Sequence, residues 1–89
     1  MDTIIGKIVT SKSGRDKGSR FAVIGIGEGD HVYIADGKIH KIAHPKKKKL
    51  KHLSFEREPL AGIDQILTRP GGTGDAALRR ALSVKDQID

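Results

Sequence analysis

Cysteine and tryptophan are absent from this 89-residue chain, and its aromatic residues are limited to Phe21, Tyr33 and Phe55. Without cysteine, neither a disulfide framework nor a cysteine-based zinc site can form. The hydrophobic fraction of 36% and the scarcity of large side chains allow only a modest aliphatic core. A chain of this size has little room for an enclosed active site, so we expect a protein without catalytic activity.

Long apolar runs are also missing. The longest, Phe21–Ile26, is far shorter than the roughly 20 residues that a membrane-spanning helix requires. Asp2 stands where a signal peptide would carry positive charge, and no apolar segment follows it. We therefore expect a soluble, cytoplasmic protein that does not associate with membranes.

Metal and nucleotide sites are not expected either. The four histidines, at positions 31, 40, 44 and 52, are joined by no cysteine and no paired carboxylate, which favours surface histidines over metal ligands. The glycine-rich stretch Gly25–Gly29 enters a predicted strand and lacks the Lys-Ser/Thr pair of a phosphate-binding loop. It is interpreted as a turn, and no cofactor is expected.

Positive charge is the dominant feature of the composition. The net charge is +6 and the isoelectric point is near 9.8. This charge is uneven, because residues 1–52 carry a net +7 whereas residues 53–89 carry a net −1. A strongly basic first part favours a polyanionic partner, most simply a nucleic acid.

The first part of the chain has the pattern of a small all-β domain. Short segments rich in β-branched and apolar residues are separated by glycine-containing turns at spacings typical of a small barrel or sandwich. Asp36-Gly37 is a strong hairpin signal, and Pro45 either ends the strand before it or confines the next segment to a sheet edge. The predicted strands are Ile4–Ser11, Arg20–Gly27, His31–Ala35, Lys38–Ala43 and Leu50–Phe55.

From Glu56 the pattern becomes helical. Apolar residues at helical spacing predict short helices over Leu60–Arg69 and Ala76–Leu82, the second of which has Leu78 and Leu82 on one face. We therefore divide the chain into a barrel over residues 1–55 and a tail over residues 56–89. The tail's one or two short helices are expected to pack on the barrel or to remain partly flexible, and the protein is expected to be a monomer.

The loop between the first two predicted strands concentrates basic residues. In the segment GKIVTSKSGRDKG, Gly14 and Gly18 permit tight turns and close approach of a ligand. Arg15 can bind a phosphate with two parallel hydrogen bonds, and Asp16 can order Arg15 or cap the turn. The alternative is an ordinary solvated hairpin loop.

A second basic segment, PKKKKLKHL over Pro45–Leu53, contains five lysines and no acid. Adjacent lysines repel one another unless they are solvated, screened or bound to anions. Leu50 and Leu53 are expected to anchor the segment to the barrel. The alternatives are a solvated charge run and a nuclear-localisation patch.

The segment GKIVTSKSGRDKG resembles the KOW motif, a strand–loop–strand unit of ribosomal proteins and transcription factors. Together with RFAVIGI, HVYIADGKIHKI and PKKKKLKHL, it makes the chain from Ile5 to about Leu53 similar to KOW-domain RNA-binding proteins. These are related to the eukaryotic and archaeal types of large-subunit ribosomal protein. The stretch GDAALRRAL is similar to the terminal helix of small bacterial members. The resemblance implies an SH3-like barrel, RNA as ligand, Gly14 as the loop glycine, and Lys12, Arg15 and Lys17 on the RNA-facing side.

We therefore predict a non-catalytic RNA-binding protein that acts in translation or on the ribosome. It would bind structured ribosomal RNA through backbone phosphates, because the scarcity of aromatic residues argues against base stacking by the barrel. The residues predicted to bind RNA are Lys12, Ser13, Gly14, Arg15, Lys17, Arg20, Lys46, Lys47, Lys48, Lys49 and Lys51.

Two other functions stay open from the sequence. One is a protein–protein adaptor of the transcription or translation machinery, with Leu78 and Leu82 of the C-terminal helix as its docking element. The other is non-specific DNA compaction, which predicts equal affinity for duplex DNA and structured RNA.

Overall fold

The computed structural model describes residues 4–60, 62–69 and 72–86. Parts of the predicted tail, at positions 61, 70–71 and 87–89, therefore lie outside the described residues. The elements, in chain order, are β1 (Lys7–Ser11), β2 (Arg20–Ile26), β3 (His31–Ala35), β4 (Lys46–Lys49), the 3-10 turn η1 (Leu50–His52), β5 (Leu53–Pro59), α1 (Ile63–Leu67) and α2 (Thr73–Asp86).

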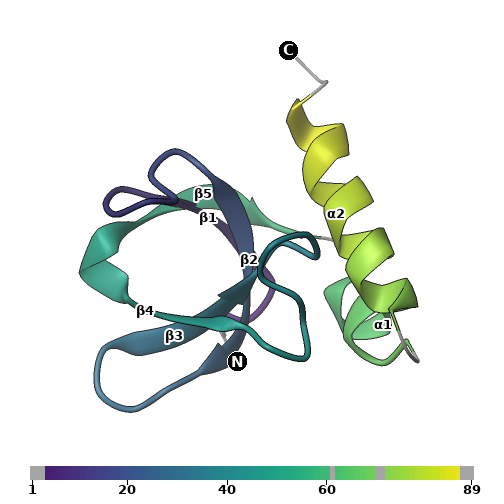
Figure 1. The fold of residues 1–89 in the computed structure, drawn as a ribbon, viewed down its shortest axis with the longest axis horizontal. Helices are drawn as coiled ribbons and strands as arrows, with labels where there is room; N and C mark the ends of the chain where they lie inside the picture. The colour runs from purple at the N-terminus through teal and green to yellow at the C-terminus, as the bar shows by residue number, and fades with distance from the viewer. Residues whose placement is uncertain (1–3, 61, 70–71, 87–89) are drawn as a thin grey trace.

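The strands form one antiparallel sheet in the order β4-β3-β2-β1-β5. The sheet curls into a barrel, and η1 joins its two edge strands, β4 and β5 (Figure 1). This arrangement confirms the predicted mainly β fold and is compatible with an SH3-like barrel. None of the helices among the described residues is long and apolar enough to cross a membrane.

Apolar side chains cover both faces of the sheet. One cluster fills the inside of the curve and is built from Val9, Phe21, Val23, Val32, Ile34 and Leu53. The other lies between the outside of the sheet and the helices and is built from Ile8, Ala22, Ala35, Ile66, Leu78 and Leu82. Alternation along a strand explains the division, since successive side chains point to opposite faces. The helices therefore lie together against one side of the barrel (Figure 1).

The two central strands agree with the prediction. Strand β2 (Arg20–Ile26) lies in the middle of the sheet with apolar residues buried on both faces, as its continuous apolar run indicated. Strand β3 (His31–Ala35) has the predicted bounds. The apolar pattern of the sequence identified these two strands, because a strand that has a neighbour on each edge lies inside the sheet and buries its apolar residues.

The predicted strand over Lys38–Ala43 is wrong, since residues 36–45 form turns and bends. The Asp36 carboxylate folds the chain locally by accepting hydrogen bonds from the backbone N–H groups of Lys38 and His40. Two contacts with α2 then hold the segment. The backbone N–H of Ile42 donates to Asp75 Oδ1 (2.7 Å), and Arg79 Nη1 donates to the carbonyl oxygen of Gly37 (2.8 Å). The segment bonds to itself and to a helix instead of extending the sheet.

The last part of the barrel is shifted along the chain relative to the prediction. The lysine run itself forms the edge strand β4, in keeping with an edge position after Pro45. The predicted strand Leu50–Phe55 is divided, because its first residues form η1 and β5 extends from Leu53 to Pro59. Leu53 is buried inside the barrel and Leu50 packs against the same cluster, which confirms that these leucines anchor the segment.

Both predicted helices are present with changed lengths. α1 (Ile63–Leu67) is shorter than predicted, and α2 (Thr73–Asp86) extends beyond Ala76–Leu82 at both ends. Leu78 and Leu82 are buried against the sheet, where the small side chains of Ala22 and Ala35 allow the helix to approach closely. These leucines form part of the core and do not lie at the surface as a docking element.

Gly37 gives a direct test of the joint between α2 and the barrel. It has a φ of +76°, and a Cβ at this position would overlap the carbonyl oxygen of Asp75 in α2. Gly29 has a φ of +61° with nothing within 4 Å of its Cβ position, so it provides a matched control. Gly29→Ala should lower the free energy of unfolding by about 1 kcal/mol through backbone strain alone. Gly37→Ala should cost about 2 kcal/mol more, because the helix must also shift.

Urea unfolding of the two variants measures this difference. If Gly37→Ala and Gly29→Ala lower the free energy of unfolding equally, α2 does not pack closely against Gly37.

Candidate nucleic-acid interface

The loop over residues 12–19 is closed at its base by backbone hydrogen bonds between Ser11, at the end of β1, and the last residues of the loop. Ser11 N–H donates to the carbonyl oxygen of Ser19 (3.0 Å), and Gly18 N–H donates to that of Ser11 (2.8 Å). Gly14 and Gly18 both have positive φ, at 83° and 90°, so the loop uses its glycines for turns that other residues rarely adopt. The side chains of Lys12, Arg15 and Lys17 are exposed around this loop.

The four lysines of β4 point alternately to opposite faces. Lys46 and Lys48 lie opposite Ile34 and Val32, whose side chains fill the inside of the barrel. Lys47 and Lys49 lie opposite Tyr33 and His31 on the outer face. Directly opposed residues in an antiparallel pair share a face, so two lysines are turned inward and two outward.

Asp16 receives the two inward lysines. Its carboxylate lies 3.0 Å from Lys46 Nζ and 3.3 Å from Lys48 Nζ, and Ser11 Oγ donates a hydrogen bond to it (3.2 Å). His40 Nε2 lies 4.0 Å from the same carboxylate. We call these five residues, Ser11, Asp16, His40, Lys46 and Lys48, the Asp16 cluster.

The Asp16 cluster closes one end of the hydrophobic interior. Ser11 and Lys48 are the buried polar residues in the described part of the chain, and the ring of His40 lies 5.7 Å from that of Phe21 in the core. Lys48 Nζ also donates to the carbonyl oxygen of Ser13 (3.1 Å). The cluster thus joins the loop, β1 and β4 above the apolar core.

The charge of Asp16 is strongly favoured in this position. Burial of the carboxylate raises its pKa, but hydrogen bonds from Lys46 and Lys48 and the positive charge of both outweigh burial and lower the pKa to about 2. The carboxylate is therefore ionised at neutral pH. Its negative charge offsets the electrostatic repulsion between the ammonium groups of Lys46 and Lys48.

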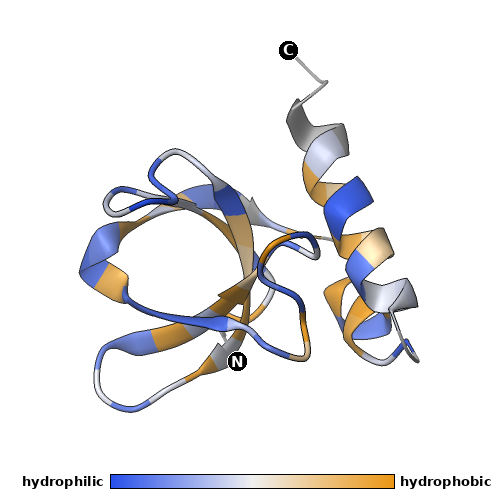
Figure 2. Ribbon diagram, viewed as in Figure 1, coloured by the Kyte–Doolittle hydropathy of each residue, from blue (hydrophilic) through white to orange (hydrophobic). Residues whose placement is uncertain are grey.

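The other lysine and arginine residues of the loop, β4 and η1 have side chains that are exposed to solvent and can contact a ligand. Lys12 N–H donates to the carbonyl oxygen of His52 (2.8 Å), so the loop lies beside η1 as well as β4. Figure 2 shows mostly hydrophilic residues along β4 and η1 and a mixture of hydrophilic and intermediate residues in the loop, on the side of the barrel away from the helices. Within the described ranges no carboxylate pairs with their exposed cations. We call this set the basic rim, and it consists of Lys12, Arg15, Lys17, Lys47, Lys49 and Lys51.

The remaining predicted RNA-binding residues have structural contacts. Arg20 Nε lies 2.9 Å from Glu56 Oε2, and Arg20 Nη1 donates to the carbonyl oxygen of Leu82, which ties β2 to β5 and α2. Arg20 borders a hollow of about 470 Å³ between α2 and the end of the loop, which is lined by Gly18 and Ser19 as well as Leu82. Ser13 and Gly14 lie in the loop itself, where the Ser13 carbonyl is occupied by Lys48. The structure thus brings most of the predicted set together, turns Lys46 and Lys48 inward, and pairs Arg20 with Glu56 and α2 on the outer face of the sheet.

The long-range role of Asp16 was missed by sequence reasoning. The prediction gave Asp16 a local task, to order Arg15 or cap the turn, whereas its carboxylate pairs with lysines some thirty positions further along the chain. The available signal was a single acid inside a basic loop, combined with a lysine run that needed an anion.

Neither the models of known protein families nor the curated proteins contain a match to this chain. The functional interpretation therefore depends on the geometry of the basic rim and on the residues themselves.

The pH dependence of stability tests the Asp16 cluster. The folded-state pKa of Asp16 is lowered from 3.8 to about 2, so its contribution is present above pH 3.8 and is lost as the pH falls through 2. Asp16→Asn should lower the free energy of unfolding by roughly 2 kcal/mol at pH 6. It should also flatten the decline between pH 4 and pH 2, measured by urea unfolding across that range. Asp64→Asn, at an exposed position of α1, is the control. An Asp16→Asn curve parallel to the wild type would refute this role.

Two double variants of the same strand separate the inward from the outward lysines. Lys46→Gln with Lys48→Gln leaves the Asp16 carboxylate without its cations and should lower the free energy of unfolding by about 2–3 kcal/mol. Lys47→Gln with Lys49→Gln removes the same charge from the outer face and should change it by less than about 0.5 kcal/mol. Thermal and urea unfolding distinguish the pairs, and similar losses would contradict the alternation of roles.

Proposed function

We propose that this protein is a non-catalytic RNA-binding protein that holds the sugar–phosphate backbone of structured RNA on its basic rim. One observation carries the proposal: six exposed cations from the loop, β4 and η1 lie on adjoining elements, and no carboxylate in the described residues neutralises them. A surface of this kind attracts a polyanion by releasing the counterions around its phosphates.

Order in the loop supports the proposal. Asp16 fixes the loop to the inward lysines of β4, so Lys12, Arg15 and Lys17 belong to a segment that is ordered before any ligand arrives. A surface that is already ordered loses less conformational entropy on binding. Gly14, with a φ of +83°, lets the loop turn tightly, and its Cβ position lies 3.6 Å from both Asp16 Oδ1 and Lys48 Nζ, so the turn packs closely on the Asp16 cluster.

The resemblance of residues 6–18 to the KOW motif adds a specific expectation. It favours ribosomal RNA as the ligand, and translation or a ribosome-associated process in the cytoplasm as the setting. The adaptor alternative receives less support, because the leucines proposed for docking, Leu78 and Leu82, are buried against the sheet.

Salt-dependent binding tests the proposal with two matched double variants. Lys47→Gln with Lys49→Gln removes two charges from the basic rim, and Arg69→Gln with Arg80→Gln removes two exposed charges from the helical region, one just after α1 and one in α2. We expect the rim variant to bind a structured ribosomal RNA fragment more weakly and to reduce the slope of log affinity against log salt by about one unit for each phosphate that is no longer bound. The helix variant should bind like the wild type.

Fluorescence anisotropy at several salt concentrations provides both quantities. If both variants lose the same affinity, the effect reflects net charge alone and the rim is not the site. A duplex DNA of equal length is the second ligand, since equal affinity for it would favour DNA compaction instead.

A further inference from the structure

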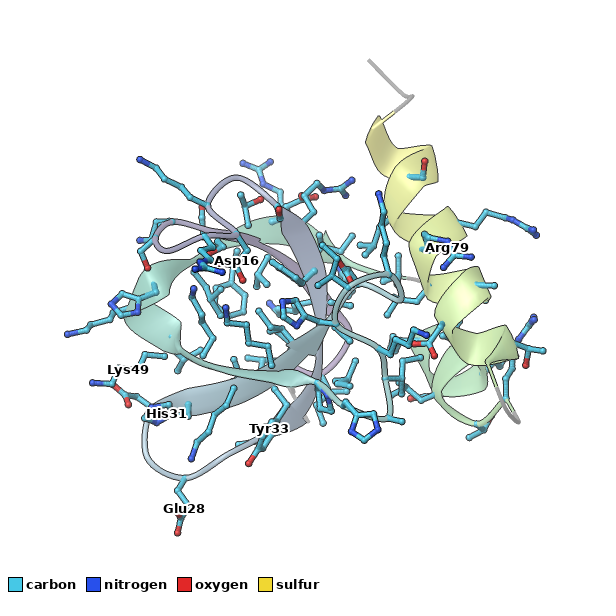
Figure 3. The ribbon with its side chains drawn as sticks, in the orientation of Figure 1. Asp16, Glu28, His31, Tyr33, Lys49 and Arg79 are labelled. Carbon is cyan, nitrogen blue, oxygen red and sulfur yellow. The ribbon has the colours of Figure 1, made fainter. Side chains whose placement is uncertain are left out.

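The outer face of β3 and β4 carries an aromatic side chain beside the basic rim. Tyr33 lies directly opposite Lys47, and its neighbour on the same face, His31, lies opposite Lys49. The tyrosine is only partly buried. In Figure 3 the side chains of His31 and Tyr33 project from the barrel on the same side as Lys49. Tyr33 is thus a surface aromatic with lysines on the adjacent strand.

The other neighbour of Tyr33 is a pair of glycines in and after β2. Gly25 lies opposite Tyr33, and its Cβ position is 3.5 Å from Cδ2 of the ring. The Cβ position of Gly27 is 3.4 Å from Cε2. The ring therefore leans over the backbone where two side chains would otherwise stand. Because neither glycine has a side chain, nothing from these positions rises beside the ring to cover it.

We propose that an unpaired nucleobase of the bound RNA stacks on Tyr33 while its flanking phosphates contact Lys47 and Lys49. This inference rests on the proposed RNA-binding function and names the part of the RNA that the site selects. Aromatic rings stack on any base, and the two lysines on the adjacent strand, Lys47 opposite the ring and Lys49 opposite His31, attract the backbone that carries the base. Lys47 and Lys49 are about 6.7 Å apart along the strand, which is comparable to one nucleotide of an extended chain.

Charge favours a nucleotide over an apolar peptide on this face. Lys47 and Lys49 are exposed, and no acid among the described residues pairs with them. The turn before β3 contains the acids Glu28 and Asp30, and there Asp30 Oδ1 is 3.6 Å from His31 Nδ1 and the backbone carbonyl of Glu28 is 3.2 Å from the same atom. This turn lies at the His31 end of the outer face. The base is therefore expected away from the turn, where Tyr33 lies beside Lys47.

This inference revises the expectation drawn from composition. Few aromatic residues argued against stacking, but one correctly placed ring is enough for a single base. Phe21 cannot serve because it is buried in the barrel. The consequence is a ligand class: RNA in which a loop, bulge or end presents an unpaired base next to the backbone held by the rim.

Tyr33 is also its own reporter, since the chain has one tyrosine and no tryptophan. We would titrate the protein with single-stranded oligouridylate and with an abasic oligonucleotide of equal length, and record tyrosine fluorescence and affinity. Oligouridylate should quench the fluorescence, whereas the abasic strand should bind without quenching. Tyr33→Ala should weaken oligouridylate binding about 5- to 100-fold and leave abasic binding unchanged, and Tyr33→Phe should retain affinity because phenylalanine also stacks.

The outcomes separate this inference from the proposed function. If both strands bind equally, without quenching and without any effect of Tyr33→Ala, stacking is refuted while backbone binding stands. If neither strand nor structured RNA binds, both proposals fail. Urea unfolding checks that Tyr33→Ala is folded, and the quenching of the wild type decides the question if it is not.

Discussion

The ion pairs of Asp16 with Lys46 and Lys48 are the constraint on which the basic surface depends. An edge strand of four lysines must turn two of them toward the interior, because its side chains alternate. Two ammonium groups at the end of an apolar core are unfavourable unless an anion meets them. Asp16 supplies that anion from a loop distant in sequence, and its lowered pKa reflects how strongly the two lysines favour its charge.

The ion pairs with Asp16 divide the four lysines of β4 into two pairs with different roles. Lys46 and Lys48 are structural, because they hold the loop over the barrel, whereas Lys47 and Lys49 stay outside with their charges unpaired among the described residues. The basic loop and the lysine run are separate features in the sequence. They become one surface because Asp16 connects the strand's inner face to the loop.

The sequence was sufficient for the parts of the fold in which local pattern and tertiary environment agree. Strands β2 and β3 were predicted from apolar content, since they are central and buried. The segment after Asp36-Gly37 was not, because contacts with Asp75 and Arg79 of α2 override its hairpin signal. Nor could local pattern show that lysines form a strand, because lysine has low strand propensity and the position depends on Asp16. For the site, the residue types were found from sequence, but which lysines face outward required the register against β3.

The position of β4 has a consequence for how copies of the protein meet one another. β4 ends the sheet, so its outer backbone groups could pair with a strand of a second molecule. Such pairing would set one lysine row against another, and the resulting repulsion opposes it. The residues proposed to attract RNA thus also discourage edge-to-edge assembly, and a polyanion that neutralises them would remove that protection.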